Sequence, residues 1–212
     1  MYQMINNNIS LLLDGINKQD HVAPYVRICS QYNNQESNTA EFKSTYRKFY
    51  QLNAAKLSAE FCDSYFELLE EHRNNVELNV EVIVNRLYEL ESNSKGTHAV
   101  HFSFATKLVH TVNNELPVYD SMVAAFYFFP DIKTSWSKDR KIQEYMSSYR
   151  FLEDEYDRII KNNLLSTSIE QFRVHFEVAE EYSTIKIIDT LLWRYAAFLK
   201  SGAIRIGEVQ YG

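Results

Sequence analysis

Apolar residues recur at helical spacing along most of this chain. Between Ile5 and Ile16 they fall at positions i, i+4, i+7, i+8 and i+11, which form one face of an amphipathic helix. Only the segment from Tyr25 to Cys29 fits a short helix and a strand equally well. The same period predicts further helices at residues 39–52, 58–72, 80–92, 103–112, 121–129, 136–162, 169–181 and 184–200. The pattern predicts an all-α fold, a single globular domain of about eight helices.

Polar residues indicate where these helices begin and end. Ser58, Asn79, Ser168 and Ser183 precede apolar periods and are predicted N-caps. Asparagine tolerates the left-handed conformation that ends helices, so its pairs indicate turns. These pairs lie at 33–34, 74–75, 113–114 and 162–163. The helix at 184–200 is apolar around most of its circumference, and we expect it to be central in the fold.

The composition fits one globular domain over residues 1–212. Hydrophobic residues make up 45%, with 13 Phe and 15 Tyr, and no linker or repeat divides the chain. Cys29 and Cys62 have no metal-type spacing, and the N-terminus lacks the pattern of a signal peptide. No apolar stretch reaches the length of a membrane span. We expect a cytoplasmic protein without a membrane contact, a metal or a cofactor.

The charge balance bears on nucleic-acid binding. A net charge of −6 disfavours non-specific binding, because phosphate neutralisation needs local Lys and Arg. A local basic face is conceivable where cations cluster between residues 133 and 158, although Asp139 and Glu144 are interleaved with them. These cations are Lys133, Lys138, Arg140, Lys141, Arg150 and Arg158. We expect an ordinary solvated helix surface here.

Residues 96–130 carry the one pattern with chemical meaning. Ser103 is a predicted N-cap that places Lys107 in the opening turns of a helix, and Asp120 is the predicted N-cap of the next. A helix N-terminus disfavours a protonated lysine and favours an ionised aspartate. A neutral amine is a nucleophile, a carboxylate can stabilise a cationic transition state, and free N–H groups can bind phosphate. Together these groups suit attack at the anomeric carbon of a nucleotide.

This segment resembles the helix-hairpin-helix DNA glycosylases, in particular the 8-oxoguanine glycosylase branch. The family hairpin reads small-x-small-Thr-Lys, and residues 103–107 read Ser-Phe-Ala-Thr-Lys. The family then has Pro-Val-Asp at the start of another helix, and residues 117–120 read Pro-Val-Tyr-Asp. Ser103 and Ala105 stand where the family has glycines, and the spacing from lysine to aspartate is shorter here. A helix-hairpin-helix-like element is expected on this basis.

The resemblance implies an enzyme that binds double-stranded DNA, flips a modified or damaged base and cleaves its N-glycosidic bond. It implies Lys107 as the nucleophile that attacks the sugar to form a Schiff base, and Asp120 as its carboxylate partner. The residues expected to contact the substrate are Ser103, Thr106, His101 and Tyr119.

A non-catalytic reading remains open. In it the chain is a helical interaction or regulatory module, Lys107 is an ordinary lysine and Asp120 is only a cap. The chain lacks a phosphate-binding glycine loop and the GxSxG, HExxH and CxxC motifs, which excludes the usual nucleotide hydrolases, α/β-hydrolases and zinc proteases.

Four further features favour structural roles. His98, His101 and His110 have no acidic or cysteine partner at a matching offset, so metal binding is disfavoured. Asp189 in the apolar last helix is costly to bury unless it is paired, and we expect an ion pair or a hydrogen bond there. The aromatic run at residues 126–129 is expected to be core.

Overall fold

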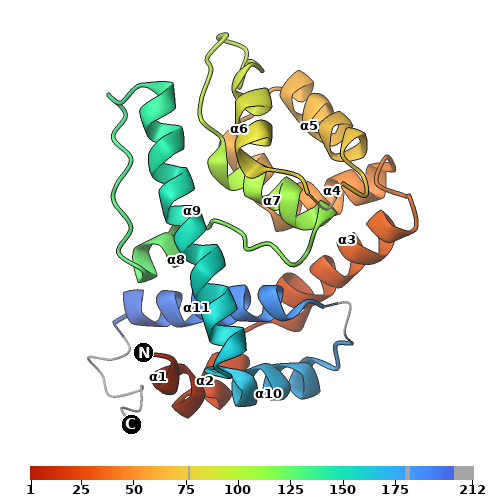
Figure 1. Cartoon of the computed structure of the whole chain (residues 1–212). Coiled ribbons are helices and arrows are strands. Elements are labelled where there is room, and N and C mark those ends of the chain that lie inside the picture. The colour runs from red at the N-terminus through yellow and green to blue at the C-terminus, as the bar shows by residue number, and fades with distance from the viewer. Residues whose placement is uncertain (76, 180–181, 203–212) are drawn as a thin grey trace.

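The computed structural model describes residues 1–75, 77–179 and 182–202, and helices make up its whole regular structure (Figure 1). Within these residues there are eleven α-helices and no strand, and eight of the helices have seven or more residues. The all-α fold with about eight substantial helices is confirmed.

The helices follow one another in short succession. They are α1 (Tyr2–Asn7), α2 (Ile9–Asp14), α3 (Ala23–Asn33), α4 (Ala40–Phe49), α5 (Ala59–Glu71), α6 (Val80–Tyr88), α7 (Phe102–Val112), α8 (Ser121–Phe126), α9 (Lys138–Lys161), α10 (Ser166–Phe176) and α11 (Thr184–Lys200). A π-helical turn, η1 (Lys18–Val22), precedes α3, and a 3₁₀ turn, η2 (Leu52–Ala55), follows α4. The ambiguous segment at Tyr25 is therefore helical.

Most predicted N-caps are present. The side chains of Ser58, Asn79, Asp120 and Ser183 each accept a hydrogen bond from a backbone N–H of the helix that follows. These contacts satisfy donors that a helix start otherwise leaves free.

Two predicted N-caps are wrong. Helix α7 begins at Phe102, so Ser103 lies inside it, and α10 begins at Ser166, so Ser168 lies inside that helix. The buried Ser168 hydroxyl instead donates to Asn6 Oδ1 at 2.5 Å. Tertiary contacts thus use a side chain that local sequence assigns to capping.

Several helices end earlier than their apolar period predicts. Gln51, with φ 63°, and Glu177, with φ 56°, adopt the left-handed conformation just after α4 and α10. The predicted helix 169–181 therefore ends at Phe176, and its last two residues lie outside the described part of the chain. The helix expected from residue 5 to 16 is interrupted at Asn8, whose amide donates to Met4 O at 2.8 Å.

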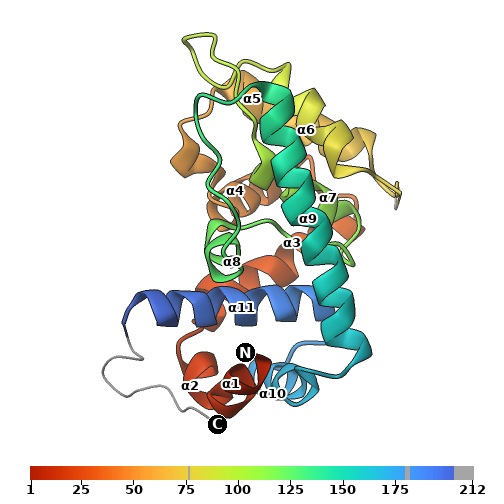
Figure 2. The same cartoon turned by 60° about the vertical axis from the view of Figure 1, so that its left-hand side comes forward.

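Helix α11 crosses the middle of the molecule. Helices α1, α2 and α10 lie on one side of it, and α3, α8 and the group α4–α7 lie on the other, while the long α9 passes alongside both (Figures 1 and 2). Eleven residues of α11 are buried, which confirms its expected central position. Gly15, at the end of α2, permits a close approach to this helix, because a Cβ there would lie 1.9 Å from Arg194 Nη2.

The aromatic run after Asp120 is only partly core. Phe126 is buried, whereas Phe128 is 92% exposed with φ 56°. The expectation that the whole run is core is wrong at Phe128, because α8 ends at Phe126 and the chain turns outward there.

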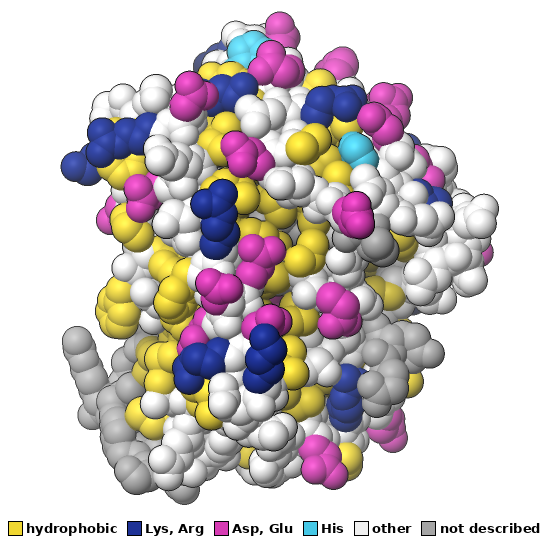
Figure 3. Space-filling view, in the orientation of Figure 1, with side chains coloured by type: hydrophobic (Ala, Val, Ile, Leu, Met, Phe, Trp, Pro, Cys, Tyr) yellow, Lys and Arg dark blue, Asp and Glu magenta, His cyan; other side chains and the backbone are white. Residues whose placement is uncertain are grey.

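The cations of residues 133–158 make mixed local contacts. Lys138 pairs with Glu89 at 3.1 Å, Arg158 pairs with Glu155 at 2.7 Å, and the Arg140 guanidinium lies over a Trp136 ring. Acidic and basic side chains are interspersed on the face that α9 crosses (Figure 3). This is the arrangement of a solvated surface. Within the residues that the structure describes, no helix combines the length and apolarity needed to cross a bilayer.

Candidate functional site

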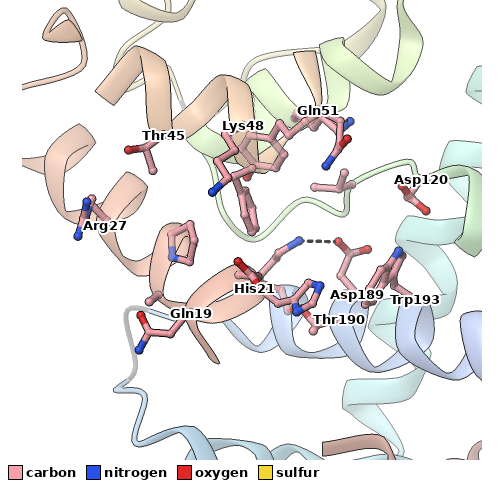
Figure 4. Close-up of a pocket in the computed structure, with 18 of the residues that line it drawn as sticks. Gln19, His21, Arg27, Thr45, Lys48, Gln51, Asp120, Asp189, Thr190 and Trp193 are labelled. Carbon is pink, nitrogen blue, oxygen red and sulfur yellow. Dashed lines mark hydrogen bonds and ion pairs between the residues drawn. The ribbon is translucent and has the colours of Figure 1, made fainter. Parts of the chain in front are cut away.

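A pocket of about 650 Å³ lies where α3, α4, α7 and α11 meet the start of α8 (Figure 4). Arg27 and Thr45 lie on one side of it, and Asp120 and Trp193 lie on the other. The charged groups that line the deeper part come from three helices far apart in sequence. They are Lys107 of α7, Asp120 at the N-cap of α8, and Lys186 and Asp189 of α11.

Lys107 lines this pocket although it is only 9% exposed. Its Nζ donates a hydrogen bond to the Tyr50 carbonyl oxygen at 3.0 Å and lies 5.1 Å from the centre of the Phe104 ring. Burial lowers the pKa of the Lys107 amine to about 8, with the Lys186 cation acting in the same direction and Asp120 and Asp189 opposing. A sizeable fraction of Lys107 is therefore neutral near physiological pH.

The physical cause of this neutrality differs from the one expected from sequence. Lys107 is the sixth residue of α7, beyond the first turn, where the helix dipole acts. Desolvation, rather than the helix N-terminus, is the main cause of its lowered pKa.

Asp120 is brought beside α7 by one backbone contact. The Tyr119 N–H donates to Thr106 Oγ1 at 3.0 Å, so the residues that directly precede Asp120 and Lys107 are joined. The Asp120 Oδ1 accepts from the Met122 N–H at 2.7 Å, which fixes the carboxylate at the start of α8. Capping and the hydrogen bond to Thr106 together place the carboxylate at the pocket.

The four residues expected to contact substrate do not line the pocket. Thr106 is buried and donates to the Ser103 carbonyl at 3.0 Å, and the Tyr119 ring packs edge-on against Phe102. His101 hydrogen-bonds Ser92 Oγ at 2.7 Å, and burial lowers its pKa to about 4. Each makes contacts that organise α7 and its neighbours.

The expected hairpin at residues 103–107 is also corrected. These residues lie within α7, which packs against α6, and the two helices are joined by residues 89–101. The backbone at the motif is therefore helical, so its N–H groups are not those of a tight loop.

Lys186 and Asp189 form the ion pair that was expected at Asp189. Lys186 Nζ lies 3.1 Å from Asp189 Oδ2, and the Tyr156 hydroxyl donates to Asp189 Oδ1 at 3.0 Å (Figure 4). Burial raises the pKa of the Asp189 carboxyl, while Lys186 and Tyr156 oppose this. Sequence reasoning assigned the pair no role at the pocket. The signal was present, since Lys186, Asp189 and Trp193 fall at i, i+3 and i+7 of an otherwise apolar helix.

One wall of the pocket has no sequence signal that reveals it. Gln19, Asp20 and His21 belong to the π-helical turn η1, and the His21 ring lies 5.2 Å from a Trp193 ring, centre to centre. Short π-helical segments occur often at functional sites. Lys48 of α4 adds a cation on the wall beside Thr45 (Figure 4).

The histidines and cysteines make structural contacts. His110 Nδ1 lies 2.6 Å from the Leu116 carbonyl and its Nε2 lies 2.9 Å from the Tyr25 hydroxyl, and burial lowers its pKa to about 3. No group of three His, Cys, Asp or Glu side chains suited to a metal occurs among the residues described. Cys29 and Cys62 are free, and burial raises the pKa of both thiols, which disfavours the nucleophilic thiolate.

The sequence matches no protein-family model, and neither a curated protein nor a solved structure matches it. Function must therefore be argued from the pocket, which holds a partly neutral amine, two carboxylates and a second amine.

Proposed function

We propose that this protein is a DNA glycosylase-like enzyme that cleaves the N-glycosidic bond of a modified or damaged base, with Lys107 as nucleophile and Asp120 as its partner. One observation carries the proposal: Lys107, with its pKa lowered to about 8, lines the same pocket as Asp120. A neutral amine beside a fixed carboxylate is the arrangement that covalent catalysis at an electrophilic carbon needs.

The proposed reaction is a hydrolysis in which every atom is accounted for. The neutral Lys107 amine attacks C1′ of a flipped nucleotide, the bond from C1′ to the base breaks, and the base leaves with the bonding pair and takes up a proton. Asp120 stabilises the positive charge that develops on the sugar and accepts a proton from the attacking amine. The resulting Schiff base is hydrolysed by water, which restores Lys107 and leaves an abasic sugar.

The pocket has the properties that such a substrate requires. Its volume of about 650 Å³ is in the range of small-ligand sites. Phe49 and Trp193 provide apolar surface for a planar ring, and Arg27 and Lys48 provide positive charge for phosphate groups.

Borohydride trapping tests the proposal directly. Duplex oligonucleotides that carry 8-oxoguanine, uracil or an abasic site are incubated with the protein and sodium borohydride, and covalent complexes are resolved by denaturing electrophoresis. We expect a trapped complex with wild type that is lost in Lys107→Gln and kept in Lys141→Gln, a lysine of α9 outside the pocket. If wild type gives no trapped complex and no duplex binding at low salt, the proposal is wrong.

A non-catalytic interaction module is the second candidate. The net charge of −6, together with basic side chains that pair locally with carboxylates such as Glu89 and Glu155, favours it. In that case Lys107→Gln leaves the interaction intact, and Asp120→Ala lowers only the stability.

A further inference from the structure

The second amine–carboxylate pair of the pocket is buried to an unusual degree. The side chains of Lys186 and Asp189 are 11% and 6% exposed, and both line the pocket. Burying an ion pair costs desolvation free energy, and replacing such a pair by apolar residues is often neutral or stabilising. The remainder of this helix face is apolar, with Ile185, Ile188 and Leu192 buried. Stability alone therefore gives no reason for charge at these two positions.

The two lysines of the pocket have different surroundings. Lys186 Nζ has a carboxylate oxygen at 3.1 Å and lies 5.6 Å from the centres of the Tyr25 and Phe49 rings, all of which favour a cation. Lys107 Nζ has a neutral carbonyl oxygen as its hydrogen-bond partner. When two amines share a desolvated site, repulsion between their charged forms is relieved if one loses its proton. The surroundings select Lys107 as the one that does.

We propose that Lys186 and Asp189 are the positioning pair of this site: the ammonium group of Lys186, fixed by Asp189 and Tyr156, keeps Lys107 in its neutral, nucleophilic form. The importance of this for catalysis rests on the proposed function, but the effect on Lys107 exists without DNA. The lowered pKa of Lys107, to which the Lys186 cation contributes, agrees with this arrangement.

Other charged groups face the same space and enter the balance. Asp120 and Asp189 favour the protonated form of Lys107 and oppose Lys186. The remaining titratable or charged groups on the pocket walls are Asp20 and His21 of η1, Arg27 of α3 and Lys48 of α4. The variants below leave all of them in place, so a change in Lys107 reports on the pair.

Competitive labelling of Lys107 with acetic anhydride measures its protonation directly. The purified full chain is labelled between pH 6 and 11, and the peptide that contains Lys107 is quantified by mass spectrometry. We expect a labelling midpoint near pH 8 in wild type. In Lys186→Met the midpoint should rise by at least one pH unit, so that labelling at pH 7 falls about tenfold. Lys186→Arg keeps the cation and should keep the low midpoint.

Two further variants separate the charge effect from damage to the fold. Lys141→Met, on α9 outside the pocket, controls for the loss of a surface lysine and should leave the midpoint unchanged. The double substitution Lys186→Met/Asp189→Asn leaves no unpaired buried carboxylate and serves if Lys186→Met does not fold. Its midpoint should rise less than that of the single variant, because an opposing charge is also removed.

The result that overturns the inference is an unchanged Lys107 midpoint in whichever of these two Met-containing variants keeps the wild-type helical spectrum and melting transition. This outcome is independent of the proposed function, since labelling is done without DNA. A wild type that labels with a low midpoint but forms no borohydride-trapped complex refutes the glycosylase proposal and leaves the role of Lys186 standing.

Discussion

The ammonium group of Lys107 donates a hydrogen bond to the carbonyl oxygen of Tyr50, 3.0 Å away and 57 positions earlier in the chain. The next residue, Gln51, has φ 63°, so the chain turns sharply just after this carbonyl. The nucleophile candidate on α7 is thus oriented by the end of α4, through an acceptor that carries no formal charge. The lysine is held in place without a carboxylate within hydrogen-bond distance.

The turn at Gln51 should be sensitive to the shape of its side chain. Gln51→Gly should raise the free energy of unfolding by up to about 1 kcal/mol, because glycine enters the left-handed region without steric cost. Gln51→Val should lower it by more than about 1 kcal/mol, since a branched Cβ is disfavoured there. Urea denaturation measures both. Equal stability of the Gly and Val variants would contradict the left-handed turn.

Replacing Lys107 with methionine should stabilise the fold. The folded-state pKa of about 8 lies below that of an unfolded lysine, so folding is opposed by this group below pH 8, and the opposition fades as pH rises above it. Lys107→Met should therefore raise the free energy of unfolding at pH 7 by on the order of 1–3 kcal/mol, and by less at pH 10. Thermal or chemical denaturation at both pH values provides the comparison. A destabilised variant at pH 7 would mean that Lys107 serves the structure rather than a reaction.

Two substitutions of Asp120 separate capping from charge. Asparagine is an equally good N-cap, so Asp120→Asn should keep the stability while removing the carboxylate, whereas Asp120→Ala should cost about 1 kcal/mol. Borohydride trapping should fall sharply in both variants. Asn79→Ala, which removes the cap of α6 away from the pocket, is the matched control and should lower the stability without affecting trapping. Normal trapping in Asp120→Asn would show that Asp120 acts only as a cap.

Acid should destabilise the fold through its buried histidines. Burial lowers the pKa of His110 to about 3, so the unfolded chain binds a proton there that the folded chain does not as pH falls below about 6.5. Stability is then lost on acidification, by about 2 kcal/mol at pH 5 from this residue. Imidazole NMR shifts should show neutral His110 at pH 5, and His110→Gln should flatten the dependence of stability on pH. The exposed His98→Gln is the control for the substitution itself.

Local sequence is sufficient for much of this fold. The apolar period locates the helices, and Ser58, Asn79, Asp120 and Ser183 mark true helix starts, because capping depends on a few neighbouring backbone atoms. Helix ends at Gln51 and Glu177 were missed, since nothing in the residue type demands a left-handed backbone there. Those conformations are imposed by the packing of distant elements.

The candidate site divides in the same way. Lys107 and Asp120 were found because they lie close in sequence, and one hydrogen bond between the neighbouring Thr106 and Tyr119 brings them together. Ser103, Thr106, His101 and Tyr119 were assigned to the substrate by proximity in sequence, although helical geometry points them into other contacts. Residues of η1 and α4 reach the pocket only through tertiary packing, which no local pattern encodes.

Helix α11 serves the core and the pocket at once, and this limits how the protein can change over evolutionary time. Lys186, Asp189 and Trp193 lie one and two turns apart in a helix most of whose other residues are buried. A substitution on this helix must satisfy close packing as well as ligand chemistry, so we expect relatives to keep it nearly fixed. Gln19 and Lys48 lie on exposed parts of the pocket wall and carry no such double demand. New ligand preferences should therefore arise from η1 and α4 on an inherited α11.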